Sequence, residues 1–174
     1  MHELLDSAAP GFDAPLQMLR ACHGRITAQC TTLQRLHQHL QAQGNDAQAV
    51  QAARAILRYF DMAGRFHHQD EEQDLFPLLR ASGSPQAAEY IDRLLQEHRT
   101  LDEAWQDLRP LLVAIAEHHA HALDGAVVER FNHGYAQHIA FENAHLLPLA
   151  ERVLDAAQLQ QLGRSMAARR GVAI

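Results

Sequence analysis

The chain has 174 residues, of which 15 are Lys or Arg and 21 are Asp or Glu, so its formal net charge is -6. This length fits one domain over residues 1–174 that buries a core without disulfides, and the negative charge argues against nucleic acid as a partner, because phosphate backbones require a basic surface. The sequence has no apolar run approaching ~20 residues and no basic, hydrophobic leader, so we expect no membrane span, no secretory signal and a cytoplasmic location.

The first predicted helix runs from about residue 13 to residue 43, and Gly44 is a natural stop after it. Apolar side chains recur there at alternating steps of three and four residues, and His23 stands within this stripe. His23 is therefore predicted to point into the core. His37 stands in the same stripe but about 21 Å from His23 along the helix axis, which is too far for the two to share one site.

The second predicted helix follows the turn after Gly44 and places a His and a Glu inside its apolar stripe. The stripe consists of Ile56, Phe60, Ala63, His67, Glu71, Leu75 and Leu78. We expect Asp70 and Glu72 on the solvated face of this helix. Pro77 removes a backbone hydrogen bond and is expected to kink or loosen the helix near its end.

The third predicted helix begins at Ser84 and Pro85 and carries His98 in its stripe. It is expected to end near Glu117. The three histidines at positions 118, 119 and 121 then fall in a loop, where such residues are more often solvated than bound to a metal.

The fourth predicted helix again places a His and a Glu on its inner face, and a short helix follows it. The inner face consists of Phe131, Gly134, His138, Glu142, His145 and Leu149. The last helix spans about residues 155–169, opens with an Asp155 to Gln158 capping pattern, and should pack on the outside. The chain is therefore predicted to be all-α, an up-down-up-down four-helix bundle over about residues 13–152 with a short C-terminal helix.

Two stretches of the chain share one pattern of His, three residues, and Glu. They read HHQDEEQDLFPL at residues 67–78 and HIAFENAHLLPL at residues 138–149, so corresponding positions are 71 residues apart. A His and a Glu four residues apart on a helix lie about 6 Å from each other on one face. Both side chains of such a pair can therefore bind one metal site from the same side.

The first stretch offers a second pair at this spacing, His68 with Glu72. The matching positions of the second stretch hold Ile139 and Asn143, and an isoleucine cannot bind a metal. The chemistry that the two stretches share therefore belongs to His67 and Glu71, together with their counterparts in the second stretch.

Counting residues outward from each turn places six polar side chains of the stripes at one level of the bundle. They are His23, His67, Glu71, His98, His138 and Glu142. Buried ions without partners cost several kcal/mol each, so a metal centre explains these six better than a buried polar network does. Two carboxylates able to bridge and four histidines suit two adjacent ions, iron first and manganese or zinc as alternatives.

The sequence resembles the hemerythrin-like family, also called the HHE cation-binding domain, over roughly residues 15–150. The motifs that carry the resemblance are His23 in CHGRI, His67 and Glu71 in HHQDEEQDLFP, His98 in EHRTLD, and His138 and Glu142 in HIAFENAHLLP. The resemblance implies a non-haem centre of two iron ions, bridged by both glutamates and by an oxo or hydroxo group. It also implies oxygen or nitric oxide as small ligands.

One position departs from the oxygen-carrying members of that family, which have a further histidine one turn after the third-helix ligand. This chain has Asp102 there. The set is thus more similar to bacterial di-iron proteins linked to nitrosative and oxidative stress and to the repair of iron centres. Three roles are open for His145, a fifth histidine ligand, a hydrogen-bond donor to a ligand residue, or a residue packed in the core, and Tyr135 is a candidate hydrogen-bond donor to a ligand.

We therefore expect a di-iron protein that binds or senses small diatomic molecules in a stress or iron-handling role. A di-iron enzyme or an iron donor in the repair of iron centres is one alternative, and a metal-stabilised structural bundle is the other. No catalytic residue outside the six is indicated, so enzymatic turnover and the protein partner stay open.

Overall fold

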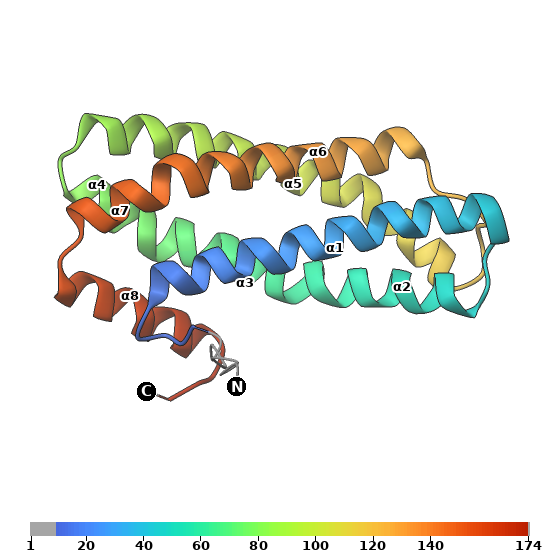
Figure 1. Ribbon diagram of the computed structural model, residues 1–174, viewed down its shortest axis with the longest axis horizontal. Helices are drawn as coiled ribbons and strands as arrows, with labels where there is room; N and C mark the ends of the chain where they lie inside the picture. The colour runs from blue at the N-terminus through green and yellow to red at the C-terminus, as the bar shows by residue number, and fades with distance from the viewer. Residues whose placement is uncertain (1–9, 174) are drawn as a thin grey trace, which may run out of the picture.

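The computed structural model describes residues 10–173, so residues 1–9 of the N-terminal stretch lie outside the description. Four long helical rods run side by side, and a shorter helix packs beside one end of them (Figure 1). Within the described range no helix combines the length and the apolar character that a membrane span requires. The predicted all-α fold is confirmed.

Two of the rods contain π-helical turns, marked η, between their α-helical parts. The first rod is α1 (Pro15–Gln43), and the third is α5 (Pro85–Ala116). The second rod consists of α2 (Ala47–Arg58), η1 (Tyr59–Gly64), α3 (Arg65–Gln69), η2 (Asp70–Leu75) and α4 (Phe76–Ala81). The fourth consists of α6 (Gly125–Phe141), η3 (Glu142–Leu146) and α7 (Leu147–Val153), and α8 (Ala156–Arg169) follows it.

Each rod packs against its neighbours in the order of an up-down-up-down bundle. Helix α1 contacts α2 and α6, and α5 contacts the same two helices, so α1 and α5 lie on a diagonal. Side-chain caps start the later helices, because Asp46, Ser84 and Asp124 each accept a hydrogen bond from a backbone N–H in the first turn. The predicted Asp155 and Gln158 capping box opens α8.

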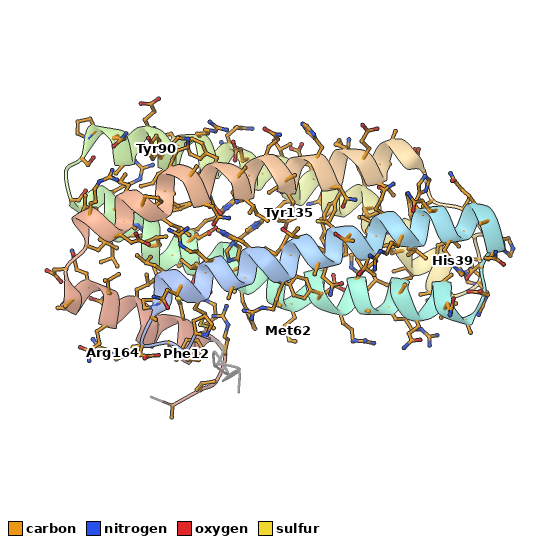
Figure 2. The ribbon with its side chains drawn as sticks, in the orientation of Figure 1. Phe12, His39, Met62, Tyr90, Tyr135 and Arg164 are labelled. Carbon is orange, nitrogen blue, oxygen red and sulfur yellow. The ribbon has the colours of Figure 1, made fainter. Side chains whose placement is uncertain are left out.

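A buried polar layer divides the apolar core into two halves. One half is built around Ile26, Leu33, Ile56, Leu108 and Phe131, and the other around Leu19, Leu75, Leu79, Ile91 and Leu146. Figure 2 shows Tyr135 inside the bundle and Met62 on its outer surface. Each half buries apolar side chains from all four rods, so the bundle has the hydrophobic stabilisation needed to hold polar groups between them.

The π-helical turns change which residues face the core, and three predicted positions are wrong as a result. Each π turn contains one more residue than an α turn, so the buried face moves one residue along the chain. Gly64 is buried in place of Ala63, and Leu79 is buried in place of Leu78, which is half-buried. In the fourth rod His145 is exposed, because Leu146 occupies the inner position that we predicted for His145.

The loosening expected at Pro77 takes the form of a π turn that precedes the proline. Pro77 is the second residue of α4, directly after η2, and Pro148 is the second residue of α7, directly after η3. At these positions the helix continues without the missing N–H. Both π turns also contain the glutamate of the repeated pattern, Glu71 in η2 and Glu142 in η3.

Helix α8 packs against α1 and against η2, and it buries a carboxylate that we expected in solvent. Asp70 is 0% exposed, and Arg170 Nη2 donates to its Oδ2 at 2.6 Å while Arg169 Nη1 donates to its Oδ1 at 2.5 Å. Gly163 lets α8 approach the segment before α1 closely, because a Cβ atom there would collide with the carbonyl oxygen of Phe12. The prediction that Asp70 lies on the solvated face is therefore wrong, because α8 covers that face.

Removing the two arginines that pair with the buried Asp70 should destabilise the protein. Replacing both Arg169 and Arg170 by Ala leaves Asp70 buried without a partner, which is expected to cost about 3 kcal/mol in the free energy of unfolding. Urea denaturation measures the change, and Arg164→Ala, at an exposed position of α8, is the matched control. Equal unfolding midpoints for the double variant and the control would contradict the assignment.

Candidate metal centre

The six side chains predicted to meet do lie together in the polar layer. His23 comes from α1, His67 from α3, His98 from α5 and His138 from α6, while the two glutamates come from η2 and η3. The exposed fractions are 1% or less for His23, His67, Glu71, His98, His138 and Glu142. Each rod therefore contributes at least one buried ligand-type side chain.

The six form two groups that overlap in the two glutamates. In one group the candidate ligand atoms of His23, His67 and both glutamates lie within 4.8 Å of one another, and in the other those of His98, His138 and the same glutamates do. Glu71 Oε1 is 3.2 Å from His67 Nε2, and Glu71 Oε2 is 3.2 Å from His98 Nε2. The two oxygens of this carboxylate therefore face different histidine pairs.

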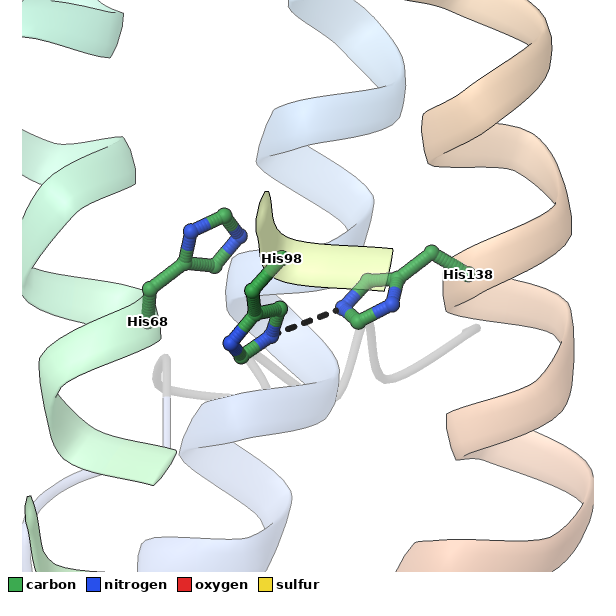
Figure 3. A group of neighbouring side chains, drawn as sticks. All are labelled: His68, His98 and His138. Atoms are coloured by element: carbon green, nitrogen blue, oxygen red, sulfur yellow. Dashed lines mark hydrogen bonds between the residues drawn. The ribbon is translucent and has the colours of Figure 1, made fainter. Parts of the chain in front are cut away.

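Glu142 lies between the same two pairs from the opposite rod. Its Oε2 is 3.0 Å from His23 Nε2 and 3.4 Å from His138 Nε2. His98 Nε2 and His138 Nε2 are 3.2 Å apart, the contact drawn as a dashed line in Figure 3. Two atoms bound to one ion at about 2.1 Å and at right angles lie about 3.0 Å apart, so these spacings fit ligands that share an ion.

Several of these atoms have no hydrogen-bond partner although they are buried. They are His23 Nε2, His67 Nε2 and both carboxylate oxygens of Glu71 and Glu142. A buried polar atom without a partner costs about 1–3 kcal/mol, and more for a charged group. A cation between these atoms would satisfy all of them, so the donor set fits a metal ion.

The electrostatics of the layer also favour cations. Burial lowers the pKa of His23, but the adjacent carboxylates of Glu142 and Glu71 raise it to about 10. Burial likewise lowers the pKa of His98, and Glu71 and Glu72 raise it to about 10. For His67 burial dominates, and its pKa falls to about 3. The glutamates thus stabilise positive charge in a layer shielded from water.

Three of the four histidines are held by a partner outside the layer. His98 Nδ1 lies 2.6 Å from Glu72 Oε1, and His138 Nδ1 lies 2.9 Å from Glu97 Oε2. His23 Nδ1 lies 2.7 Å from Asn143 Oδ1. Each of these oxygens accepts the Nδ1 hydrogen, which leaves Nε2 as a lone-pair donor directed into the layer.

Sequence reasoning missed these outer partners, although each is the chain neighbour of a candidate ligand or of its glutamate. Glu97 precedes His98, Glu72 follows Glu71, and Asn143 follows Glu142. Glu72 is 42% exposed, as expected for the solvated face, but its carboxylate also anchors His98. The polar neighbours of the repeated His and Glu were the signal that could have identified them.

Tyr135, His145 and the three loop histidines lie outside the cluster of six side chains. His145 is exposed and packs on the rings of Phe141 and Tyr90 at 4.9 and 5.8 Å, so it belongs neither to the core nor to the cluster. Tyr135 is buried and lies 6.0 Å from the His68 ring between centroids. The loop histidines at 118, 119 and 121 are exposed, as expected.

A sequence model described as the hemerythrin HHE cation binding domain matches residues 14–150. The chain belongs to this family. A protein of Haemophilus influenzae described as uncharacterized is 35% identical over 161 residues, which cover 92% of each chain. The hemerythrin match spans all four rods, and the cluster of buried His and Glu in this chain is the place where such a domain would bind its cation.

Removing a shared glutamate is expected to release metal from both groups of ligands. Glu71→Ala and Glu142→Ala should each lower the bound metal per chain by tenfold or more, because each carboxylate serves both histidine pairs. Elemental analysis of protein purified in parallel measures this loss. Glu103→Ala, at an exposed position of α5, is the control, and full metal content in either cluster variant would contradict the shared role.

Removing the metal is expected to weaken the fold without unfolding it. The apolar halves remain packed, but the buried atoms lose their cation, so the melting temperature should fall by about 5–10 °C while the helical circular dichroism persists. The comparison is between metal-loaded and chelator-treated protein. The melting temperature of a Glu71→Ala, Glu142→Ala double variant should not depend on metal. Superimposable melting curves for the unsubstituted protein with and without metal would refute a metal ion bound in the buried layer.

Proposed function

We propose that this hemerythrin-family protein holds two iron ions in its buried layer and binds a small diatomic molecule, oxygen or nitric oxide, at that centre. The observation that carries the proposal is the sharing of two carboxylates between two histidine pairs. The two oxygens of Glu71 are directed at different pairs, an arrangement that favours two adjacent ions over one. His23 with His67 would hold the first ion, and His98 with His138 the second.

The chemistry of the donors supports iron. The two groups contain imidazole nitrogen and carboxylate oxygen and no thiolate, because neither Cys22 nor Cys30 belongs to them. Mixed N and O donors suit iron, with manganese or zinc as alternatives, and a structural zinc site is disfavoured without sulfur ligands. Bound iron would supply the capacity to exchange electrons and to take a ligand from outside.

The surroundings of the layer support a small, neutral ligand. Two imidazoles, two carboxylates and a bridging oxo or hydroxo group would supply five donors to an ion and would leave a position for one more. Ile26, Leu94 and Leu101, which are 3% exposed or less, belong to the apolar halves on either side of the layer. A diatomic molecule fits such surroundings, whereas a bulky or charged substrate would have to displace the core.

Binding is favoured over turnover because no acid–base pair beyond the cluster and its anchors is indicated. An iron donor or an enzyme in the repair of iron centres is the second candidate, and it requires release or exchange of the iron. A metal-stabilised bundle is the third, and it requires no position for an external ligand. The three differ in how the reduced protein responds to gas.

Anaerobic purification with metal analysis and optical spectroscopy tests the proposal. The reduced protein is expected to hold about two irons per chain and to develop new visible absorption when nitric oxide is added, because nitric oxide binds ferrous iron at the remaining position. The zinc-loaded protein is the control and should not respond. Loss of iron on exposure to the gas would favour the donor function, and an unchanged spectrum of the iron-loaded protein would favour a structural role.

A further inference from the structure

A hollow on the surface lies between α2 and the turn that ends α5, and three basic side chains line it. Its volume is about 450 Å³, and its lining residues are Ala47, Val50, Gln51, Arg54, Arg58 and His118. The turn after α5 lies at the end of the bundle where α2 begins (Figure 1). Arg54 precedes His67 by 13 residues in the same rod, which is about 20 Å along its axis, so the hollow is separate from the buried layer.

The two arginines lie one helical turn apart on α2 and carry the same charge. Like charges at this spacing repel each other and destabilise a helix. Other surface arginines of the chain pair with a carboxylate, as Arg109 does with Asp61. Within residues 10–173 neither Arg54 nor Arg58 forms such an ion pair. An anion bound between the two guanidinium groups would offset their repulsion.

His118 occupies a backbone position that favours glycine. Its φ is 59°, and the other residues with positive φ in the described range are all glycines. The N–H of His118 donates to the carbonyl of Ile115 at 3.1 Å, and that of His119 donates to the carbonyl of Ala114 at 2.8 Å. This is the Schellman pattern, whose left-handed residue is usually glycine. Histidine at this position strains the turn and places an imidazole in the hollow.

Hydrogen bonds from the second rod fix the turn and one of the arginines. Asn45 Nδ2 donates to two backbone carbonyls, one on each side of His118 in the chain, at 2.9 and 2.7 Å. Arg54 Nη2 donates to the carbonyl of Ala116 at 3.3 Å. A guanidinium has five N–H donors, so the other donors of Arg54 are available to a second acceptor. The basic groups are therefore held in place before any ligand binds.

The carboxylates closest along the chain to these groups have other partners. Asp46 Oδ1 accepts a hydrogen bond from the N–H of Ala49 at 3.0 Å and lies 2.9 Å from His39 Nε2. Glu117 Oε2 lies 3.4 Å from His119 Nδ1. Neither acidic residue lines the hollow. The hollow thus gathers positive charge on a chain whose formal net charge is -6.

We propose that this hollow binds the phosphate group of a small, soluble phosphomonoester. The forked guanidinium groups of Arg54 and Arg58 suit the oxygens of a phosphate, which they bind with two parallel hydrogen bonds each. The imidazole of His118 donates one more. A hollow of this volume accommodates a small organic molecule, and Ala47 and Val50 provide an apolar wall for the part that carries the phosphate.

The lining favours a soluble ligand over the headgroups of a lipid surface. Helices that bind at a membrane surface insert large apolar side chains beside their basic residues. The exposed large apolar residues of the described range are Met62 and Val172, and neither lines the hollow. The basic groups therefore lack the apolar neighbours that would anchor them in a bilayer.

Calorimetric titration of the metal-loaded protein with glycerol 3-phosphate and with inorganic phosphate, at constant ionic strength, tests the proposal. An Arg54→Gln, Arg58→Gln double variant should bind either phosphate at least tenfold more weakly, because it loses both guanidinium groups. The control is an Arg35→Gln, Arg152→Gln double variant, which removes the same charge from two exposed positions elsewhere and should bind normally. Equal weakening in both double variants would overturn the proposal.

His118→Gly separates binding from the stability of the turn. Glycine adopts the left-handed conformation without strain, so the melting temperature should rise by about 2 °C while the affinity for phosphate falls several-fold. Unchanged affinity would overturn the role of His118.

Metal analysis and vesicles exclude other sites of binding. The metal content of the arginine and His118 variants should equal that of the unsubstituted protein. Phosphate binding that persists in the Arg54→Gln, Arg58→Gln variant but disappears in Glu71→Ala would place the anion in the buried layer and overturn the proposal. Binding to phosphatidylglycerol vesicles without binding of either soluble phosphate would overturn the assignment to a soluble ligand.

Discussion

Two carboxylates buried among four imidazoles are the constraint on which the rest of this bundle depends. Glu71 and Glu142 are 0% exposed and face each other across the layer from opposite rods. Taking such groups out of water is unfavourable unless positive charge accompanies them. The apolar halves on either side provide the hydrophobic stabilisation that offsets this cost, and they keep the layer dry enough for the carboxylates to hold cations.

The arrangement of the layer is maintained from its edge. Glu72 and Glu97 are partly exposed, yet each fixes one imidazole by accepting its outer hydrogen. The nitrogen that faces inward is then available as a ligand without any rearrangement. Partly exposed carboxylates therefore fix the orientation of buried imidazoles on the His98 and His138 side, whereas the amide of Asn143 does so for His23.

Much of this structure follows from periodicity in the sequence. The stripes gave the four rods, their ends and the six residues of the layer, because counting from turns works wherever helices rise uniformly. Single positions were misplaced within or after the π turns, although Glu71 and Glu142, which lie in two of these turns, were placed correctly. The π turn that begins at Glu142 shifts the inner position from His145 to Leu146, while Leu149 is buried as predicted. Asp70 was misplaced because no local pattern reveals which face α8 covers.

Helix α8 lies beyond residues 14–150, the segment that matches the hemerythrin family. Arg169 and Arg170, at the C-terminal end of this helix, nevertheless pair with Asp70, the residue before Glu71. The segment that matches the family therefore ends before a helix that packs against α1 and η2. A fragment ending at residue 150 would retain all six residues of the layer, but it would expose Asp70 and the back of η2 to water. Water would then reach the residue beside Glu71, so a helix outside the matched segment shields one side of the layer that the matched segment supplies.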